Sequence, residues 1–332
     1  MNKVIFTICS NNYLAQAKTL GDSIKKTNSD YEFIIFLCDK RNEQIDYSFF
    51  KNMSLYFIEE LQIHSFDVMK SKYDITELNT AIKPFIFQYI YNNFNADTVF
   101  YIDPDVELYD SLNIIEKKLE NNIAVLTPHI LQPIKENAFP TLENSLMLTG
   151  IYNLGFLATK KCQDIDKMLD WWTKRLLVGC YNRRHLGAFV DQLPMTFLPI
   201  FFNNVSVLKH YGLNVAHWNL HERTLSRNEG KYIINNKYPL IFFHFSGYSP
   251  LKPDIITKRW KNCLLNDEVL KQLHYDYADK MLANKYELFK NYKCAYIRNS
   301  WLERKLLYTQ SVLLFLMKKI DTIVDYIRTK NL

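Results

Sequence analysis

The sequence has few of the residues that form flexible linkers, disulfide frameworks or zinc sites. It contains only 8 Gly and 10 Pro in 332 residues and no low-complexity tract, which favours a folded chain with short linkers. Its six cysteines are scattered without a C-x-x-C pair, which argues against a zinc site or disulfide scaffold and favours a reducing cytoplasm. No run of about 18 apolar residues is present, and the N-terminal apolar stretch is short for a signal peptide, so we expect no membrane-spanning segment.

The charge of the chain is modest. The formal net charge of +6 fits an anionic substrate, an anionic surface or a chance surplus equally well. Basic residues are dispersed and no recognised nucleic-acid-binding motif is present, so nucleic acid is not an expected partner. The apolar content of 48% is sufficient for one large core, with or without an appendage.

Strand-like and helix-like patterns alternate along the first 110 residues. Apolar runs predict buried strands, and amphipathic patterns predict the helices between them. This alternation favours an α/β fold in which an open, mostly parallel sheet is flanked by helices. The expected strands are 3–9, 31–39, 55–61, 97–105, 122–129, 150–160, 213–220 and 239–248. The expected helices are 14–27, 79–94, 162–180 and most of the chain after residue 255.

Two carboxylates follow the strand expected at 97–105. In open α/β sheets, ligands bind outside the carboxyl ends of the strands, where Asp103 and Asp105 are placed. Side chains at i and i+2 point the same way, so this pair can share one hard cation, and Pro104 fixes the backbone between them. A solvated Asp-Pro-Asp turn explains the triplet equally well.

Four segments, read in chain order, carry a family resemblance. They are FTICSNNYLAQAKTLGDSI, NTAIKPFIF, the Asp103/Asp105 pair and FFHFSGYSPLKP, which is similar to an H-x-x-G-x-x-K-P motif. Together they resemble the nucleotide-sugar glycosyltransferases of the GT-A fold, most closely glycosyltransferase family 8, over residues 3–253. The resemblance implies a Rossmann-like mixed, mostly parallel sheet, a UDP-sugar donor and a Mn²⁺ or Mg²⁺ ion.

The resemblance also implies roles in donor binding. Thr7, Asn12 and Tyr13 would contact the base, with Tyr13 stacked on uracil, and Lys83 would lie near the diphosphate. Without the resemblance, the first segment is equally well a polar loop with one aromatic side chain. Lys83 is then a helix-surface lysine.

For the metal, the resemblance implies His244 as the third protein ligand beside Asp103 and Asp105. Gly247 would let the backbone approach the phosphates, and Lys252 would supply a positive charge there. A histidine in an apolar strand is otherwise most simply a hydrogen-bonded core residue.

The sugar-binding and catalytic residues are implied by the segments YNLGF and FVDQLPMTFL. Asn153 and Gly155 would face the sugar, Asp191 its hydroxyls and Gln192 the β-face of the anomeric carbon. Transfer with retention would then need electrostatic support rather than a strong base. The alternatives are an inverting enzyme with Asp191 as the base, and an inactive sugar-nucleotide-binding scaffold.

Two polar segments have no assigned role. HWNLHER at 217–223 either lines the donor or acceptor pocket or forms a surface ion pair. NRRHLG at 182–187 either meets an anionic acceptor or is solvated.

The C-terminal segment has a heptad pattern and an excess of basic residues. Three interpretations remain open: docking on the parent domain, pairing with a second copy, or lying on an anionic bilayer that holds a lipid-linked acceptor. We expect a catalytic domain at 1–254 and a helical extension at 255–332. The expected function is sugar transfer to a glycan or lipid-linked acceptor in surface polysaccharide synthesis, in the cytoplasm or at the inner face of the membrane. The heptad positions are Leu302, Leu306, Thr309, Leu313, Leu316, Ile320, Ile323 and Ile327.

Overall fold

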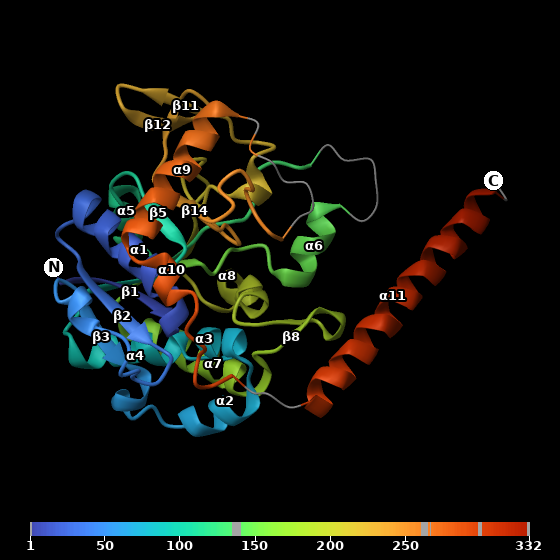
Figure 1. Cartoon of the computed structure of the whole chain (residues 1–332), viewed down its shortest axis with the longest axis horizontal. Coiled ribbons are helices and arrows are strands. Elements are labelled where there is room, and N and C mark those ends of the chain that lie inside the picture. Colours follow the sequence, from blue (N-terminus) through green and yellow to red (C-terminus); the bar gives the residue numbers. More distant parts are fainter. Residues whose placement is uncertain (1, 135–140, 260–264, 266, 298–300, 331–332) are drawn as a thin grey trace. The chain divides into compact units, whose positions relative to one another are not determined.

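A seven-stranded sheet forms the centre of the protein (Figure 1). The computed structural model describes residues 2–134, 141–259, 265, 267–297 and 301–330. The strand order is β10-β6-β7-β4-β1-β2-β3; β1 is parallel to β2 and β4, and β7 is antiparallel to β4 and β6. The prediction of a mixed, mostly parallel α/β sheet is confirmed. The strands are β1 (Lys3–Cys9), β2 (Glu32–Leu37), β3 (Ser54–Phe57), β4 (Thr98–Ile102), β6 (Ala124–Leu126), β7 (Phe156–Lys160) and β10 (Val205–Val207).

Both faces of this sheet are covered by helices, which explains why its strands are continuous apolar runs rather than alternating ones. Helices α4 and α7 pack on the face that contains Phe6 and Tyr101. Helices α1 and α5 pack on the face that contains Ile5 and Phe100. Their bounds are α1 (Leu14–Thr27), α4 (Lys83–Asn93), α5 (Asn113–Leu119) and α7 (Gln163–Gly179).

The helix expected at 79–94 is two helices in the structure. Helix α3 (Ile75–Ala81) ends before Ile82, and α4 begins at Lys83 with Pro84 in its first turn. Proline is accommodated there because the first N–H groups of a helix have no partner within the helix. The break matters for the site because it places Lys83 at the start of a helix.

A second, two-stranded sheet lies beside the carboxyl end of β4. Strand β14 (Phe242–His244) pairs antiparallel with β5 (Val106–Leu108). Helix α9 (Glu268–Ala283) packs on β14 in a separate apolar cluster, in which the ring of Tyr277 stacks on that of Phe245 at a centroid distance of 3.7 Å.

By packing, the chain divides into Met1–Tyr296 and Ile297–Leu332. The division into a catalytic domain at 1–254 and an extension at 255–332 stays a prediction about function.

Several expected elements differ from the observed ones. Residues 213–220 are not a strand: Val215 forms an isolated bridge with Phe243, and the following residues turn through a 3₁₀ helix at His217–Asn219. Only the second half of 150–160 is a strand, and no described residue between 255 and 267 is helical. A hairpin of β11 (Leu225–Asn228) and β12 (Lys231–Ile234) was not expected.

The remaining short elements surround this framework. The strands are β8 (Asn182–Arg183), β9 (Ala188–Phe189) and β13 (Tyr238–Pro239). The α-helices are α2 (Phe66–Lys72), α6 (Leu142–Thr149), α8 (Leu198–Phe201) and α10 (Tyr286–Phe289). The other 3₁₀ helices are η1 (Asn11–Tyr13), η2 (Tyr47–Phe50), η3 (Ile58–Leu61), η4 (Arg184–Leu186) and η5 (Leu193–Phe197).

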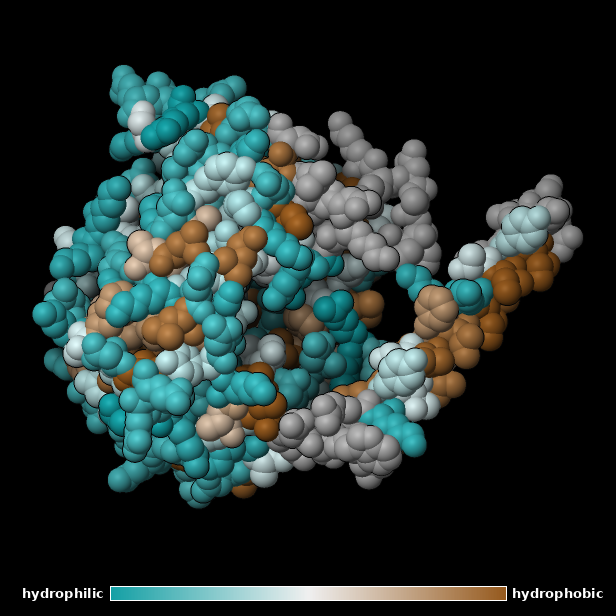
Figure 2. All heavy atoms as spheres, in the orientation of Figure 1, coloured by the Kyte–Doolittle hydropathy of each residue, from teal (hydrophilic) through white to brown (hydrophobic). Residues whose placement is uncertain are grey.

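The second unit is built on one long helix, α11 (Trp301–Lys330). Among the side chains of this helix that the structure describes, apolar ones such as Leu306, Leu313 and Ile320 are exposed, and Figure 2 shows hydrophobic residues along much of its length. None of the helices within the described residues combines the length and the apolar character that crossing a bilayer requires.

The buried His274 predicts an acid-sensitive core. Its ring packs edge-on against Phe243, Phe245 and Tyr248, and burial lowers its pKa from 6.5 to about 4. Between these pH values the unfolded chain binds a proton that the folded chain excludes, so the unfolding free energy should fall as the pH falls, by about 3 kcal/mol from this group. In urea titrations at several pH values, His274→Phe should weaken this pH dependence; an unchanged dependence would contradict the assignment.

Candidate metal centre and adjoining pocket

Asp103, Asp105 and His244 meet at the carboxyl end of β4. The two aspartates belong to the turn between β4 and β5, and the pairing of β14 with β5 places His244 opposite Val106. The backbone N–H of Asp103 donates to the carbonyl of Gly155 at 2.8 Å, which fixes the start of the turn. One ligand atom from each of the three side chains lies within 4.8 Å of the others, so the expected triad is assembled in space.

The three side chains form a donor set that fits a divalent cation. Nε2 of His244 lies 3.1 Å from Oδ1 of Asp105 and 3.7 Å from Oδ2 of Asp103. Burial disfavours the charged imidazole, but the carboxylates of Asp105 and Asp103 together outweigh burial and raise the pKa of His244. Burial likewise disfavours the carboxylate of Asp105, and His244 and Arg259, together with a backbone hydrogen bond, outweigh it and lower the pKa of that carboxyl. Two carboxylates and one imidazole suit Mn²⁺ or Mg²⁺.

Because Gly155 has no side chain, the triad can pack directly against its backbone. A Cβ atom at this position would lie 2.6 Å from Cε1 of His244, 2.7 Å from Oδ1 of Asn153 and 2.8 Å from Oδ2 of Asp103. Real Cβ atoms essentially never make such contacts. Gly155 was expected to face the sugar, and the structure gives it a further role as the residue that lets Asp103 and His244 approach each other.

Aromatic and imidazole rings pack behind His244. The ring of Trp218 meets it edge-on at 5.2 Å, and His129 packs on the other side of Trp218 at 5.4 Å. Burial lowers the pKa of His129 to about 4, so the ring is neutral near pH 7. Its Nε2 therefore accepts from Nδ2 of Asn153 at 3.1 Å, and its Nδ1–H donates to the carbonyl of Ile151 at 3.2 Å.

The sequence did not lead us to His129 or Trp218. The unusual aromatic content of HWNLHER was a signal for Trp218, but it could not show the contact with His244. His129 follows a strand without a motif of its own, and its role depends on a hydrogen bond to Asn153.

Lys83 lies between two carboxylates. Its Nζ is 2.7 Å from Oδ2 of Asp191 and 3.8 Å from Oδ1 of Asp103, and it donates to the carbonyl of Leu154 at 2.9 Å. The side chains of Lys83 and Asp191 are only 3% and 2% exposed, so this is a buried ion pair. Burial raises the pKa of Asp191, and Lys83 opposes that effect. The contact of Lys83 with a diphosphate stays a prediction.

Gln192 and Asn153 are both bound to the loop before β7. Oε1 of Gln192 accepts from the N–H of Leu154 at 3.1 Å, and its Nε2 donates to the carbonyl of Thr149 at 2.8 Å. Oδ1 of Asn153 accepts from the N–H of Gly155 at 3.1 Å. These bonds fix the loop that carries Gly155 against the metal centre, and the contacts of both amides with a sugar stay predictions.

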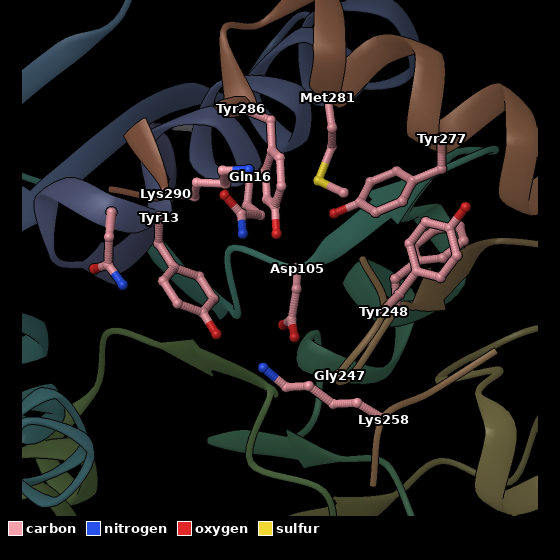
Figure 3. Close-up of a pocket in the computed structure, with 12 residues that line it drawn as sticks. Tyr13, Gln16, Asp105, Gly247, Tyr248, Lys258, Tyr277, Met281, Tyr286 and Lys290 are labelled. Carbon is pink, nitrogen blue, oxygen red and sulfur yellow. The ribbon is translucent and has the colours of Figure 1, made fainter. Parts of the chain in front are cut away.

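A pocket of about 230 Å³ adjoins the metal centre (Figure 3). The carboxylate of Asp105, the hydroxyl of Tyr13 and the ammonium of Lys258 point toward its middle. Part of the lining comes from η1 and α1, and another part comes from α9, α10 and the residue after it. The first part includes Asn12, Tyr13 and Gln16, and the second Tyr277, Met281, Tyr286 and Lys290.

Three of the residues expected at the donor line this pocket, namely Asn12, Tyr13 and Gly247. Gly247 has φ +75°, and a Cβ there would lie 2.7 Å from Oγ1 of Thr257, so both conformation and space favour glycine. Thr7 is fully buried in β1 and is not among the described lining residues.

Two lysines line the pocket, Lys258 and Lys290, and the motif indicated neither of them. In the family motif, Lys follows Gly after two residues, whereas four residues separate Gly247 from Lys252 here. Lys252 is exposed and lies outside the described lining of the pocket, which includes Lys258 instead. The basic run TKRWK at 257–261 was the available signal.

The side chains of Glu222 and Arg223 in the HWNLHER segment are buried and bind the backbone of other segments, rather than lining the pocket or forming a surface ion pair. The carboxylate of Glu222 accepts from the N–H groups of Leu131 and Gln132, and Nη1 of Arg223 donates to the carbonyl of Leu213. The Glu222 and Arg223 side chains are 0% and 1% exposed and lie 3.4 Å apart.

No family model matches the sequence. Two uncharacterized proteins of Bacillus subtilis (strain 168) are similar to it: YfnF, 29% identical over 75% of this chain and 82% of YfnF, and YfnD, 21% identical over 82% and 86%. The galactosyltransferase LgtC, solved with donor and acceptor sugar analogues, matches with a TM-score of 0.51 at 17% identity over 83% of this chain and 95% of LgtC. An active-site mutant of LgtC gives a TM-score of 0.50 at 15% identity. The expected GT-A fold is confirmed.

Gly155→Ala should weaken divalent-ion binding. The added methyl group displaces His244 or Asp103, and disturbance of the groups that support a metal site typically costs about 10- to 100-fold in affinity. The measurement is an electron paramagnetic resonance titration with Mn²⁺. Gly179→Ala is the matched control, because no atom lies within 4 Å of its added Cβ. Equal Mn²⁺ affinity in both variants would contradict the proposed packing.

Lys83→Met should destabilise the folded chain. It leaves Asp191 buried without its counter-charge, and breaking a buried pair in this way costs about 3–5 kcal/mol. Urea unfolding near neutral pH measures the loss. The double variant Lys83→Met/Asp191→Asn also removes the unpaired carboxylate of Asp191, so it should recover part of the lost unfolding free energy. If Lys83→Met is as stable as the parent, the pair contributes nothing to stability.

Proposed function

We propose that this chain is a metal-dependent glycosyltransferase that moves a sugar from a UDP-sugar to a glycan or lipid-linked acceptor with net retention. The observation that carries the proposal is the Asp103, Asp105 and His244 triad, which adjoins a pocket through Asp105 in a GT-A fold. A fold by itself is compatible with many functions, so the argument rests on this site.

The triad supplies the metal-binding part of the proposal. A bound divalent cation would neutralise charge on the departing nucleoside diphosphate. Asp103, Asp105 and His244 would hold it, with Mn²⁺ and Mg²⁺ both suited to the oxygen-rich set. Lys258 adds a positive charge on the pocket side of Asp105.

The pocket supplies the nucleotide-binding part. Tyr13 is 38% exposed and offers a ring for stacking, and Asn12 is a polar neighbour for the base. Gly247 brings bare backbone to the pocket wall, which suits contact with phosphate oxygens. The sequence-based roles of Thr7 and Lys252 remain part of the proposal without support from the pocket lining.

The surroundings of Asp191 favour retention over inversion. An inverting enzyme needs a general base within reach of the acceptor hydroxyl. Asp191 is 2% exposed and paired with Lys83, so its carboxylate is poorly placed to take a proton from an incoming acceptor. Retention instead needs electrostatic support near the anomeric carbon, which Asp191 and Gln192 would provide by positioning the sugar-facing loop.

The remaining parts of the proposal concern partners and location. Three parts of the proposal rest on the sequence. The acceptor belongs to surface polysaccharide synthesis, and residues 1–254 are the catalytic part. Helix α11 contacts a second copy or the inner face of the membrane. The exposed apolar side chains of α11 support such a contact. A catalytically inactive scaffold is disfavoured, because sugar-nucleotide binding alone does not require a complete triad.

Asp103→Ala and Asp105→Ala should each abolish Mn²⁺-dependent turnover of UDP-sugars while the protein stays folded. Both side chains contribute to the site rather than to the apolar core. Hydrolysis of a panel of UDP-sugars is followed by NMR, which also reports the product anomer, and circular dichroism follows the fold. Asp67→Ala, in a side chain that is 91% exposed, is the matched control. Full activity in either site variant would overturn the proposal, and an inverted product anomer would replace retention with inversion.

A further inference from the structure

A group of apolar side chains lies exposed on the main unit, away from α11 in the sequence. We call Trp171, Leu186, Phe197, Ile200 and Phe201 the aromatic surface. Leu186, Phe197, Ile200 and Phe201 are 67%, 50%, 74% and 55% exposed, and Trp171 is partly buried. They come from α7, η4, η5 and α8. Such concentrations of exposed apolar side chains on a soluble protein usually mark an interaction site.

The rings of this surface hold each other in place. Phe197 and Phe201 stack at a centroid distance of 5.4 Å with an interplanar angle of 9°, and Trp171 meets Phe201 edge-on at 5.7 Å. A hollow of about 260 Å³ lies among them, and Leu193 and Pro194 line it as well. The surface is therefore an ordered apolar feature rather than a set of isolated side chains.

The segments that carry the aromatic surface are rich in basic residues. Residues 171–201 contain Lys174, Arg175, Arg183 and Arg184, and their one acidic residue, Asp191, is buried and paired with Lys83. Lys174 is paired with Asp170 on the preceding turn. The exposed guanidinium groups of Arg183 and Arg184 lie over the rings of Tyr181 and Phe189, and Arg175 lines the hollow itself. Arg175 thus brings positive charge to the hollow, and the segments beside it in the sequence carry more.

The aromatic surface is continuous along the chain with the candidate active site. Helix η5 begins at Leu193, directly after Asp191 and Gln192. The carboxylate of Asp191 is joined through Lys83 to Asp103 of the metal centre. A partner that binds the aromatic surface would therefore contact η5, the helix that directly follows Asp191 and Gln192.

We propose that the aromatic surface docks on a bilayer that contains anionic lipids. The apolar side chains would enter the region between headgroups and acyl chains, and Arg175, Arg183 and Arg184 would face lipid phosphates. This goes beyond the proposed sugar transfer, because it assigns a membrane contact to the main unit and does not depend on the reaction.

The positive charge of these segments favours a bilayer over a second copy of the chain. A two-fold symmetric contact uses the same patch of both copies, so it would bring two sets of these basic residues to one interface. Like charges at such a contact are unfavourable, whereas an anionic bilayer offers opposite charge around an apolar interior.

The test is co-sedimentation of the full chain with phosphatidylcholine vesicles, with and without phosphatidylglycerol. The parent should bind only the anionic vesicles. Phe197→Ser/Phe201→Ser should lower the bound fraction. Arg183→Gln/Arg184→Gln should lower partitioning about thirtyfold, because each basic side chain near an anionic surface contributes about fivefold. The arginine pair is exposed, so this variant stays informative if the phenylalanine variant does not fold.

The matched controls are Val68→Ser, in an apolar side chain that is 60% exposed on α2, and Lys25→Gln/Lys26→Gln at the end of α1. Both should bind the anionic vesicles as the parent does. Unchanged binding in the phenylalanine and arginine variants, or an equal loss in the controls, would overturn the proposal. The proposal would also be overturned if the parent chain is a dimer in gel filtration and Phe197→Ser/Phe201→Ser is a monomer. UDP-sugar hydrolysis by that variant without vesicles should match the parent, which separates this proposal from the proposed function.

Discussion

The pairing of β14 with β5 is the constraint on which the candidate site depends. It joins a late strand to the turn after β4 and thereby sets His244 opposite Val106, one residue from Asp105. Alone, Asp103 and Asp105 are the polar end of a buried strand. With the imidazole added and Gly155 leaving room beside it, the same two carboxylates become a three-sided donor set. Backbone hydrogen bonds between distant segments thus create a chemistry that neither segment has by itself.

Electrostatics gives this arrangement a reason to take up a cation. Three carboxylates, those of Asp103, Asp105 and Asp191, lie close together, and Lys83 and His244 are the basic groups in direct contact with them. Carboxylates with few counter-charges in a partly buried site are unfavourable unless a cation or a proton joins them. Protonation of His244, whose pKa is raised, is one way to offset the negative charge of these carboxylates. A divalent ion is the other, and it frees the imidazole nitrogen to act as a ligand.

The sequence predicted best the elements that depend on neighbouring residues in the chain, and the two acidic residues at the end of β4. The predicted bounds of β1 and α1 match the observed ones, because β1 is a clear apolar run and α1 has a clear amphipathic pattern. Asp103 and Asp105 were indicated by their spacing at the end of a strand, whereas His244 was indicated as a third ligand only by the family motif. The strand expected at 213–220 was wrong, because Val215 makes only one bridge and Asn219 then accepts from the N–H of Ala216 to close a turn.

The pocket wall formed by α9 and α10 could not be found from local pattern, because it is built by packing over a long sequence distance. Tyr277 stacks on Phe245, the residue directly after His244, and this contact holds α9 over the end of β14. The same packing brings Tyr286 and Lys290 to the pocket on the side of Tyr13 (Figure 3). The polar side chains of this wall are therefore fixed by an apolar contact beside the metal centre. A change that loosened α9 would alter the nucleotide side of the pocket and the strand that carries His244 at the same time, so that the two halves of the site cannot vary independently.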